Sequence, residues 1–190
     1  MIRIALAVAL ALAVTGAAAA TTDYAIDPHH TMVIASWSHM GYSHPSANFA
    51  GATGTLTWDD KDVTKSKVKV TIPMDKVDTF VPALTSEFLT PKFFDTAKYP
   101  VATFTSTRVQ AVDGTHLKVT GDFAMHGVSK PVTLDVTVNK VGAVPMMKSK
   151  VIGFDATGTL MRSAFGVSMG VPMVGDEVAL RITTEAHAPL

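Results

Sequence analysis

Hydrophobic and polar residues alternate with a period of two along most of this chain. In "TMVIASWSH" (31–39), every second residue from Val33 to His39 falls on one face of an extended chain, and "VKVTI" (68–72) places its three apolar residues together. The same pattern recurs in five further segments: "VATFTSTRV", "HLKVTGDFAM", "VTLDVTVNKV", "VIGFDATGTLM" and "EVALRITTEA". These segments are predicted to be half-buried β-strands.

Glycine, proline, aspartate and asparagine separate the strands, and no helical segment alternates with them as a parallel sheet would require. About eight antiparallel strands in a chain of this size predict an all-β barrel or sandwich. "GATG" (51–54) lacks the following lysine and helix of a phosphate-binding loop, so it is interpreted as a bend or bulge in a strand.

A short helical insertion is predicted near residues 81–96. Leu84 and Phe88 lie four residues apart, which places them on one helical face. Thr90 before Pro91 is typical of an N-cap followed by a proline at the first helical position, and predicts a second short helix. The adjacent rings of Phe93 and Phe94 follow. We expect this helix to lie across one end of the barrel, with one of the two rings packing beneath it and the other directed inward.

The first twenty residues differ from the rest of the chain. They carry Arg3, an apolar stretch over 4–14 and a run of small residues, which together predict a secretory signal peptide over 1–20 with cleavage near Ala18 to Ala20. An uncleaved membrane anchor is the alternative, although the apolar stretch is shorter than a spanning helix needs. Residues 21–190 are predicted to form one domain in the periplasm or outside the cell.

Composition narrows the class of partner. Sixteen basic and sixteen acidic side chains balance, so no net field attracts nucleic acid. The chain has no cysteine, so an exported form would depend on core packing and sheet hydrogen bonds for its stability.

The seven histidines are the obvious candidates for catalysis or metal binding, and four of them lie within residues 29–44. No carboxylate or cysteine stands near them at a spacing typical of zinc sites, and no serine lies in a glycine-flanked elbow. We therefore predict no catalytic residue, no metal site and no cofactor.

Apolar side chains of an adaptable kind are more numerous than strand packing requires. They comprise several phenylalanines together with the methionines at 125, 161, 169 and 173. An ordinary core is one interpretation. The other is an apolar pocket, because the interior of an eight-stranded barrel holds either its own side chains or one small ligand.

Seven motifs in order resemble the YceI-like family of exported, lipocalin-like barrels. "YAIDPHHT" (24–31) and "SHMG" (38–41) look like its opening strand, and "NFAGATGTL" (48–56) looks like its next hairpin. "FFDTAKYPVATFTS" (93–106) is similar to its most recognisable block. "GDFAMHGVSKPVTLDV" (121–136), "RSAFGV" (162–167) and "VGDEVAL" (174–180) follow at matching positions, so the resemblance covers about Tyr24 to Ala186.

The resemblance implies an extended antiparallel barrel around an apolar tunnel that binds an isoprenoid-type lipid, such as a polyprenyl phosphate or a quinone, without catalysis. The family's histidines look retained at His30, His39 and His126, and its late arginine at Arg162. Ala35 and Ala52 stand where the family often has phenylalanine, which indicates an altered tunnel width that Trp37 or Phe88 offsets. The predicted ligand contacts are Trp37, His39, Phe49, Phe88, Phe93, Phe94, Phe104, His126, Arg162 and Phe165.

Within this prediction the protein is a lipid carrier or scavenger, with transient membrane contact and oligomer formation both open. Two alternatives are a histidine-dependent metal-binding stress protein or enzyme of the envelope, and an interaction module with a filled core.

Overall fold

The strands of the computed structural model join edge to edge into one sheet. The structure describes residues 21–190, so the predicted signal peptide over residues 1–20 lies outside the described part. Within that part the strand segments are β1 (Thr21–Ile26), β2 (Met32–His39), β3 (Ser46–Phe49), β4 (Thr53–Asp59), β5 (Lys67–Pro73), β6 (Val77–Asp78), β7 (Val101–Ala111), β8 (His116–Met125), β9 (Val128–Val144), β10 (Ser149–Met161) and β11 (Val174–Pro189).

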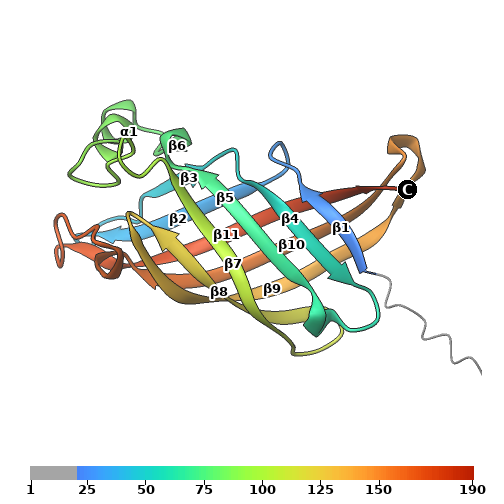
Figure 1. Ribbon diagram of the computed structural model, residues 1–190. Coiled ribbons are helices and arrows are strands. Elements are labelled where there is room, and N and C mark those ends of the chain that lie inside the picture. The colour runs from blue at the N-terminus through green and yellow to red at the C-terminus, as the bar shows by residue number, and fades with distance from the viewer. Residues whose placement is uncertain (1–20) are drawn as a thin grey trace, which may run out of the picture.

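The sheet closes on itself as an antiparallel barrel. The order β1-β4-β5-β7-β8-β9-β10-β11 returns to its start because β1 also pairs with β11, through Ala25 with His187 and Ile26 with Ala186. The segments β2, β3 and β6 continue the lines of β1, β4 and β5, so eight strands surround the interior (Figure 1). The predicted eight-stranded barrel is confirmed.

Three of the eight strands are interrupted. β2 pairs with β3 and β1 with β4, whereas β3 and β4 do not pair with each other. The hairpin expected over 48–56 is therefore wrong, and these residues form one bent strand. Gly51 at the bend has φ +74°, a conformation that glycine adopts without strain, which agrees with the bend interpreted from "GATG".

The long strands β7 to β11 show why the alternation is a good guide to this fold. In β10, Ile152, Phe154 and Ala156 are buried whereas Asp155 and Thr157 are exposed. Successive side chains on a strand point to opposite faces of the sheet, so a period of two separates an interior face from a solvent face.

One α-helix, α1 (Pro82–Phe88), interrupts the strands within the described residues, between β6 and β7. Pro82 stands at its first turn, where the missing N–H is not needed. Residues 91–99 form turns, so the second helix expected from Thr90 and Pro91 is wrong. The Thr90 hydroxyl instead donates to the carbonyl of Glu87 at 2.7 Å, at the end of α1, and Asp95 has φ +45°, which no α-helix accommodates.

The barrel has two different ends, visible at left and right in Figure 1. The mouth end carries α1, the β2–β3 turn and the β10–β11 connection, which begins with the 3-10 turn η4 (Arg162–Phe165). The far end carries the η1 turn (Val63–Lys65), the η3 turn (Pro145–Met147) between β9 and β10, and the C-terminus. The short η2 turn (Met74–Lys76) connects β5 to β6.

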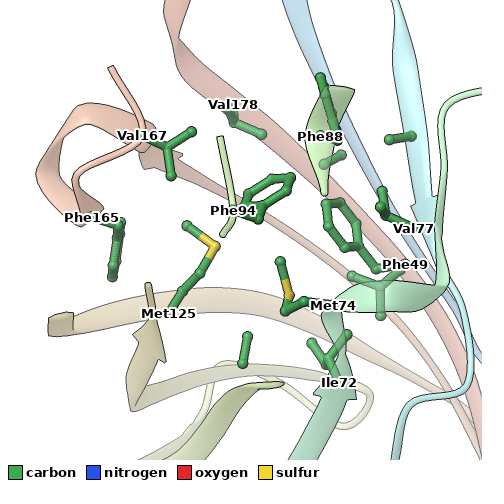
Figure 2. Packing of buried hydrophobic residues seen from close by; sticks show 14 of the residues in the cluster. Phe49, Ile72, Met74, Val77, Phe88, Phe94, Met125, Phe165, Val167 and Val178 are labelled. Atoms are coloured by element: carbon green, nitrogen blue, oxygen red, sulfur yellow. The ribbon is translucent and has the colours of Figure 1, made fainter. Parts of the chain in front are cut away.

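Buried apolar side chains form two clusters along the barrel. The first gathers at the mouth end around Phe49, Phe88, Phe94 and Phe165, and Figure 2 shows Phe94 amid this cluster with Phe165 at its edge. The second lies toward the far end and includes Trp58 and other large residues. Among residues 21–190, no helix has the length and apolar character needed to cross a bilayer.

Candidate functional site

A cavity of about 650 Å³ runs inside the barrel. This volume lies within the range of about 300–1,000 Å³ that is usual for small-molecule sites, so the interior is hollow and the filled-core alternative does not fit. The lining joins both apolar clusters, from Phe88 and Val167 at the mouth end to Leu117 and Trp58 at the far end. The cavity is therefore long as well as apolar.

The mouth end of the cavity is built from aromatic rings that come from four segments of the chain. The Phe88 ring on α1 lies 5.6 Å from Trp37 on β2, 4.9 Å from Phe93 and 5.5 Å from Phe94, measured between ring centroids. Phe94 also meets Phe49 of β3 edge to face at 5.6 Å. Such pairs contribute about 0.5–1.5 kcal/mol beyond their burial, so this cluster fastens the α1 segment onto the barrel.

The two adjacent phenylalanines both face the cavity. Phe94 is buried, and Phe93 is half-buried and stacked on Phe88. The expectation that only one ring points inward is wrong. The backbone explains the difference, because the Phe94 N–H bonds back to the carbonyl of Phe88 at 3.1 Å and folds the turn over the barrel end.

At the far end the cavity is bounded by Trp58 of β4 and Phe154 of β10. Their rings meet edge to face with centroids 5.9 Å apart. Phe104 of β7 lines the wall nearby, in the same apolar cluster. Ser66 and Lys67, which follow the η1 turn, also contribute to the lining.

Few lining residues carry polar side chains. They are Thr31, His39, Ser66, Lys67, Thr79, Glu87, Arg162 and Thr184. Thr31 and Thr184 satisfy each other, with 2.7 Å between their hydroxyl oxygens, so they add little polarity to the wall. Residues that could hold a polar group of a ligand therefore concentrate near the two ends.

Arg162 is the most constrained of these residues. It is buried, and its guanidinium donates to one carbonyl of the β10–β11 connection and to two at the start of β11: Nη1 to Val167 at 2.9 Å, Nη2 to Val174 at 2.9 Å and Nε to Gly175 at 2.8 Å. Burial lowers the pKa of Arg162, and the nearby Asp176 carboxylate acts in the opposite direction. The guanidinium fixes this connection in place, and each of its two Nη atoms retains one further N–H.

The three histidines considered for head-group contact have different positions. His39 is exposed and lines the cavity at the mouth end. His126 lies outside the lining, where its Nδ1 contacts the carbonyl of Phe165 at 3.2 Å and its ring packs 4.6 Å from Tyr99.

His30 also lies outside the lining, in the break between β1 and β2. Its Nδ1 is 2.6 Å from Asp27 Oδ2, and this hydrogen bond raises the pKa of His30 and lowers that of Asp27. Among residues 21–190, no three histidine, aspartate or glutamate side chains converge in an arrangement suited to a metal ion.

Phe165 is likewise outside the lining. It is 2% exposed and packs edge to face against Phe123 at 5.4 Å, so it supports the cavity wall from behind. The other eight predicted contacts all line the cavity: Trp37, His39, Phe49, Phe88, Phe93, Phe94, Phe104 and Arg162. Their contact with a ligand stays a prediction.

Several lining residues were not singled out from the sequence. Val132, Leu134 and Val136 on β9 alternate in "VTLDVTV", and this period of two was a usable signal. Glu87 and Thr79 had no such signal, because they lie in the irregular segment around α1 and only its docking brings them to the rim.

Comparisons with known proteins agree with this architecture. The family model of the YceI-like domain matches residues 24–186. Protein YceI of Escherichia coli O157:H7 is 38% identical over 169 residues, which cover 88% of this chain and 87% of that protein.

Two solved structures share the fold. BcnA of Burkholderia cenocepacia superposes with a TM-score of 0.76 at 24% identity, covering 84% of this chain and 98% of that one. A polyisoprenoid binding domain from Saccharophagus degradans gives 0.67 at 16% identity, with 87% and 98% covered. The family model matches nearly the whole described barrel, and the closed, hollow sheet agrees with it. This chain therefore belongs to the YceI-like family.

Proposed function

We propose that this protein holds a long apolar lipid of the isoprenoid class in its barrel cavity, as a carrier or scavenger and without chemistry. The observation that supports this most directly is the cavity of about 650 Å³ whose wall is apolar between its two ends. A related fold occurs in a polyisoprenoid binding domain, which supports the same class of ligand.

The energetics of such a ligand depend on its source. Removing a tail from water is worth about 0.8 kcal/mol per CH₂-sized group. A tail that leaves a bilayer exchanges one apolar environment for another, so this term nearly cancels. Selectivity must then come from the length of the cavity and from contacts with the head group.

The polar groups at the mouth end suggest how a head group is held. The remaining N–H groups of Arg162 can donate to an oxygen of a phosphate, hydroxyl or quinone. His39 offers a second donor or acceptor at the rim, whereas Glu87 would repel an anionic head that approached its carboxylate. The site therefore suits an oxygen-bearing head on a long tail.

The test is to identify what the purified protein contains. Organic-solvent extraction of the protein, produced in a bacterium with its first twenty residues present, should release an isoprenoid lipid detectable by mass spectrometry. Protein stripped of lipid should then take up polyprenyl phosphate or a long-tailed quinone, and the recovered ligand should have an unchanged mass. An empty extract together with no uptake of either compound would contradict the proposal.

We also propose that the protein is exported, with cleavage near Ala18 to Ala20, since residues 1–20 have the composition of a signal peptide. The intact mass of protein from a periplasmic fraction should then lack these residues. Recovery of the full chain from the cytoplasm alone would refute export and leave the cavity proposal unaffected.

A further inference from the structure

Two turns at the mouth end expose large apolar side chains side by side. Met40 and Tyr42 of the β2–β3 turn are 50% and 90% exposed, and Met169 and Met173 of the β10–β11 connection are 48% and 65% exposed. The turns are joined by a hydrogen bond from the Met40 N–H to the carbonyl of Met173 at 2.9 Å. We refer to residues 40–45 and 166–173 as the mouth loops.

The mouth loops carry none of the charges found elsewhere on the chain. The protein has sixteen basic and sixteen acidic residues, yet "MGYSHP" (40–45) and "GVSMGVPM" (166–173) contain no lysine, arginine, aspartate or glutamate. Their titratable side chains are His44 and the phenol of Tyr42. An exposed apolar surface without charge is costly in water and is suited to a partner that is itself apolar.

This surface is continuous with the cavity. Met169 and Gly170 are exposed on the mouth loops and also line the cavity, as does Pro45 at the end of the first loop. A chain molecule that entered between the loops would pass from one apolar surface to another. The cavity and the loops therefore make one apolar path from outside the barrel to its interior.

We propose that the mouth loops dock on a lipid bilayer, inserting Met40, Tyr42, Met169 and Met173 into its interface so that a lipid tail enters the cavity without crossing water. The inference rests on the proposed function for its purpose, because a tail drawn from a membrane needs a path that stays apolar. Tyrosine suits the boundary between headgroups and acyl chains, since its ring is apolar and its hydroxyl is polar. The absence of formal charge on the loops fits a surface of zwitterionic lipid.

The far end provides a matched comparison within the same chain. Met146 and Met147 in the η3 turn are 94% and 51% exposed, so that end also presents two methionines. Lys140, Lys148 and Lys150 stand near them in the sequence, and this end holds the C-terminus (Figure 1). Lysine-flanked methionines would favour an anionic surface, whereas the mouth loops would not depend on lipid charge.

The experiment measures flotation of lipid-free protein with vesicles of pure phosphatidylcholine. The double variant Met40→Ser/Met173→Ser should lower the vesicle partition coefficient about tenfold or more, because two side chains lose their apolar contact. The variant Met146→Ser/Met147→Ser should change it by less than about twofold. Binding of the parent protein should persist from about 0.1 M to about 1 M salt, where Coulomb attraction is screened.

A second measurement uses tryptophan fluorescence and removes no methionine from the mouth loops. Tyr42→Trp should gain fluorescence quenching by brominated phosphatidylcholine relative to the parent, and Met146→Trp should not. Both changes are at exposed positions, and thermal unfolding of each variant checks that the barrel is intact.

Three results would overturn the proposal: no flotation of the parent protein, equal flotation of the two double variants, or flotation that salt abolishes. A parent that is dimeric in solution and becomes monomeric through Met40→Ser/Met173→Ser, without vesicle binding, would assign the loops to a second copy instead. Because the vesicles contain no isoprenoid, flotation does not depend on cargo. An extract without isoprenoid, together with no uptake of polyprenyl phosphate or quinone, would refute the proposed function while leaving the flotation result to decide this one.

Discussion

Replacing Ala156 with phenylalanine should shorten the tail that the cavity accepts. Ala156 is buried on β10, lines the cavity, and pairs with Val136 and Ile182, which line it as well. A phenyl ring at this position adds about six carbon atoms to the interior, and an isoprene unit has about five, so at least one unit is displaced. At about 0.8 kcal/mol per CH₂-sized group, a unit is worth about 4 kcal/mol relative to water, or about a thousandfold in affinity.

The assay is displacement of a fluorescent fatty probe from lipid-free protein by prenols of increasing length. Affinity should rise with length in the parent and reach its plateau at least one isoprene unit earlier in Ala156→Phe. Thr159→Phe places the same ring on the exposed face of the same strand and should leave the plateau unchanged. Because the ring enters an existing void, the free energy of unfolding should change by less than the usual overpacking cost of about 1–3 kcal/mol. A plateau at the same length in parent and Ala156→Phe would show that the tail does not lie along this wall.

Three further changes test individual interactions. Arg162→Met should lower the free energy of unfolding by about 3–5 kcal/mol in urea denaturation, because one buried and two partly buried carbonyls lose a charged donor. Arg162→Lys should restore only part of this loss, and equal stability of all three proteins would contradict the structural role of the guanidinium. Phe165→Ala should lower the free energy of unfolding by about 3–5 kcal/mol in the same measurement. Lipid affinity should stay within about threefold, since Phe165 packs behind the cavity wall. An affinity loss larger than the stability loss would place Phe165 in the site. Asp27→Asn should lower the pKa of His30 toward 6.5 in an NMR titration, because the carboxylate that stabilises the imidazolium is gone, and an unchanged midpoint would refute the pairing.

The pKa shifts of Asp27 and His30 determine the pH range in which this pair contributes to stability. The folded-state pKa of His30 is raised, so its contribution is present below its unfolded value and is lost as pH rises through the folded pKa. The folded-state pKa of Asp27 is lowered, so its contribution is present above its unfolded value and is lost as pH falls through the folded pKa. The contribution is therefore fully present between the unfolded-state pKa values of the two groups, and it is small because the imidazole is exposed.

The alternation of residues was sufficient to predict an antiparallel all-β fold, and the family resemblance favoured a barrel over a sandwich. A strand buried on one face must alternate, and "VIGFDATGTLM" does so with Phe154 and Ala156 inward. Whether the interior is filled or hollow could not follow from the same pattern, since both cases place the same residues inward. The answer depends on how the rings of Phe88, Phe93 and Phe94 pack at the mouth, which only the three-dimensional structure shows.

The local signals near Thr90 and His126 were less reliable. Thr-Pro is compatible with a helix start and with a turn, and the hydrogen bond from the Thr90 hydroxyl to Glu87 decides for the turn. His126 was considered for ligand contact because its family position looked retained. Retention is equally explained by its contacts with Tyr99 and with the backbone of Phe165, which hold the β8–β9 turn to the segment before β7 and to the η4 turn.

The interruptions at 27–31, 50–52 and 74–76 lie next to one another across three adjacent strands. The strands from β7 to β11 instead run for 10 to 17 residues each. The barrel wall is therefore unequal in stiffness, with a line of strand interruptions on one side, which we call the crease, and longer strands on the other. We expect amide hydrogens along the crease to exchange faster than those in the middle of β9 and β10. A cargo wider than the resting cavity would then be accommodated by separation of the strand segments at the crease. The longer strands of the opposite side would keep their shape and set the length of the lipid tail that the cavity accepts.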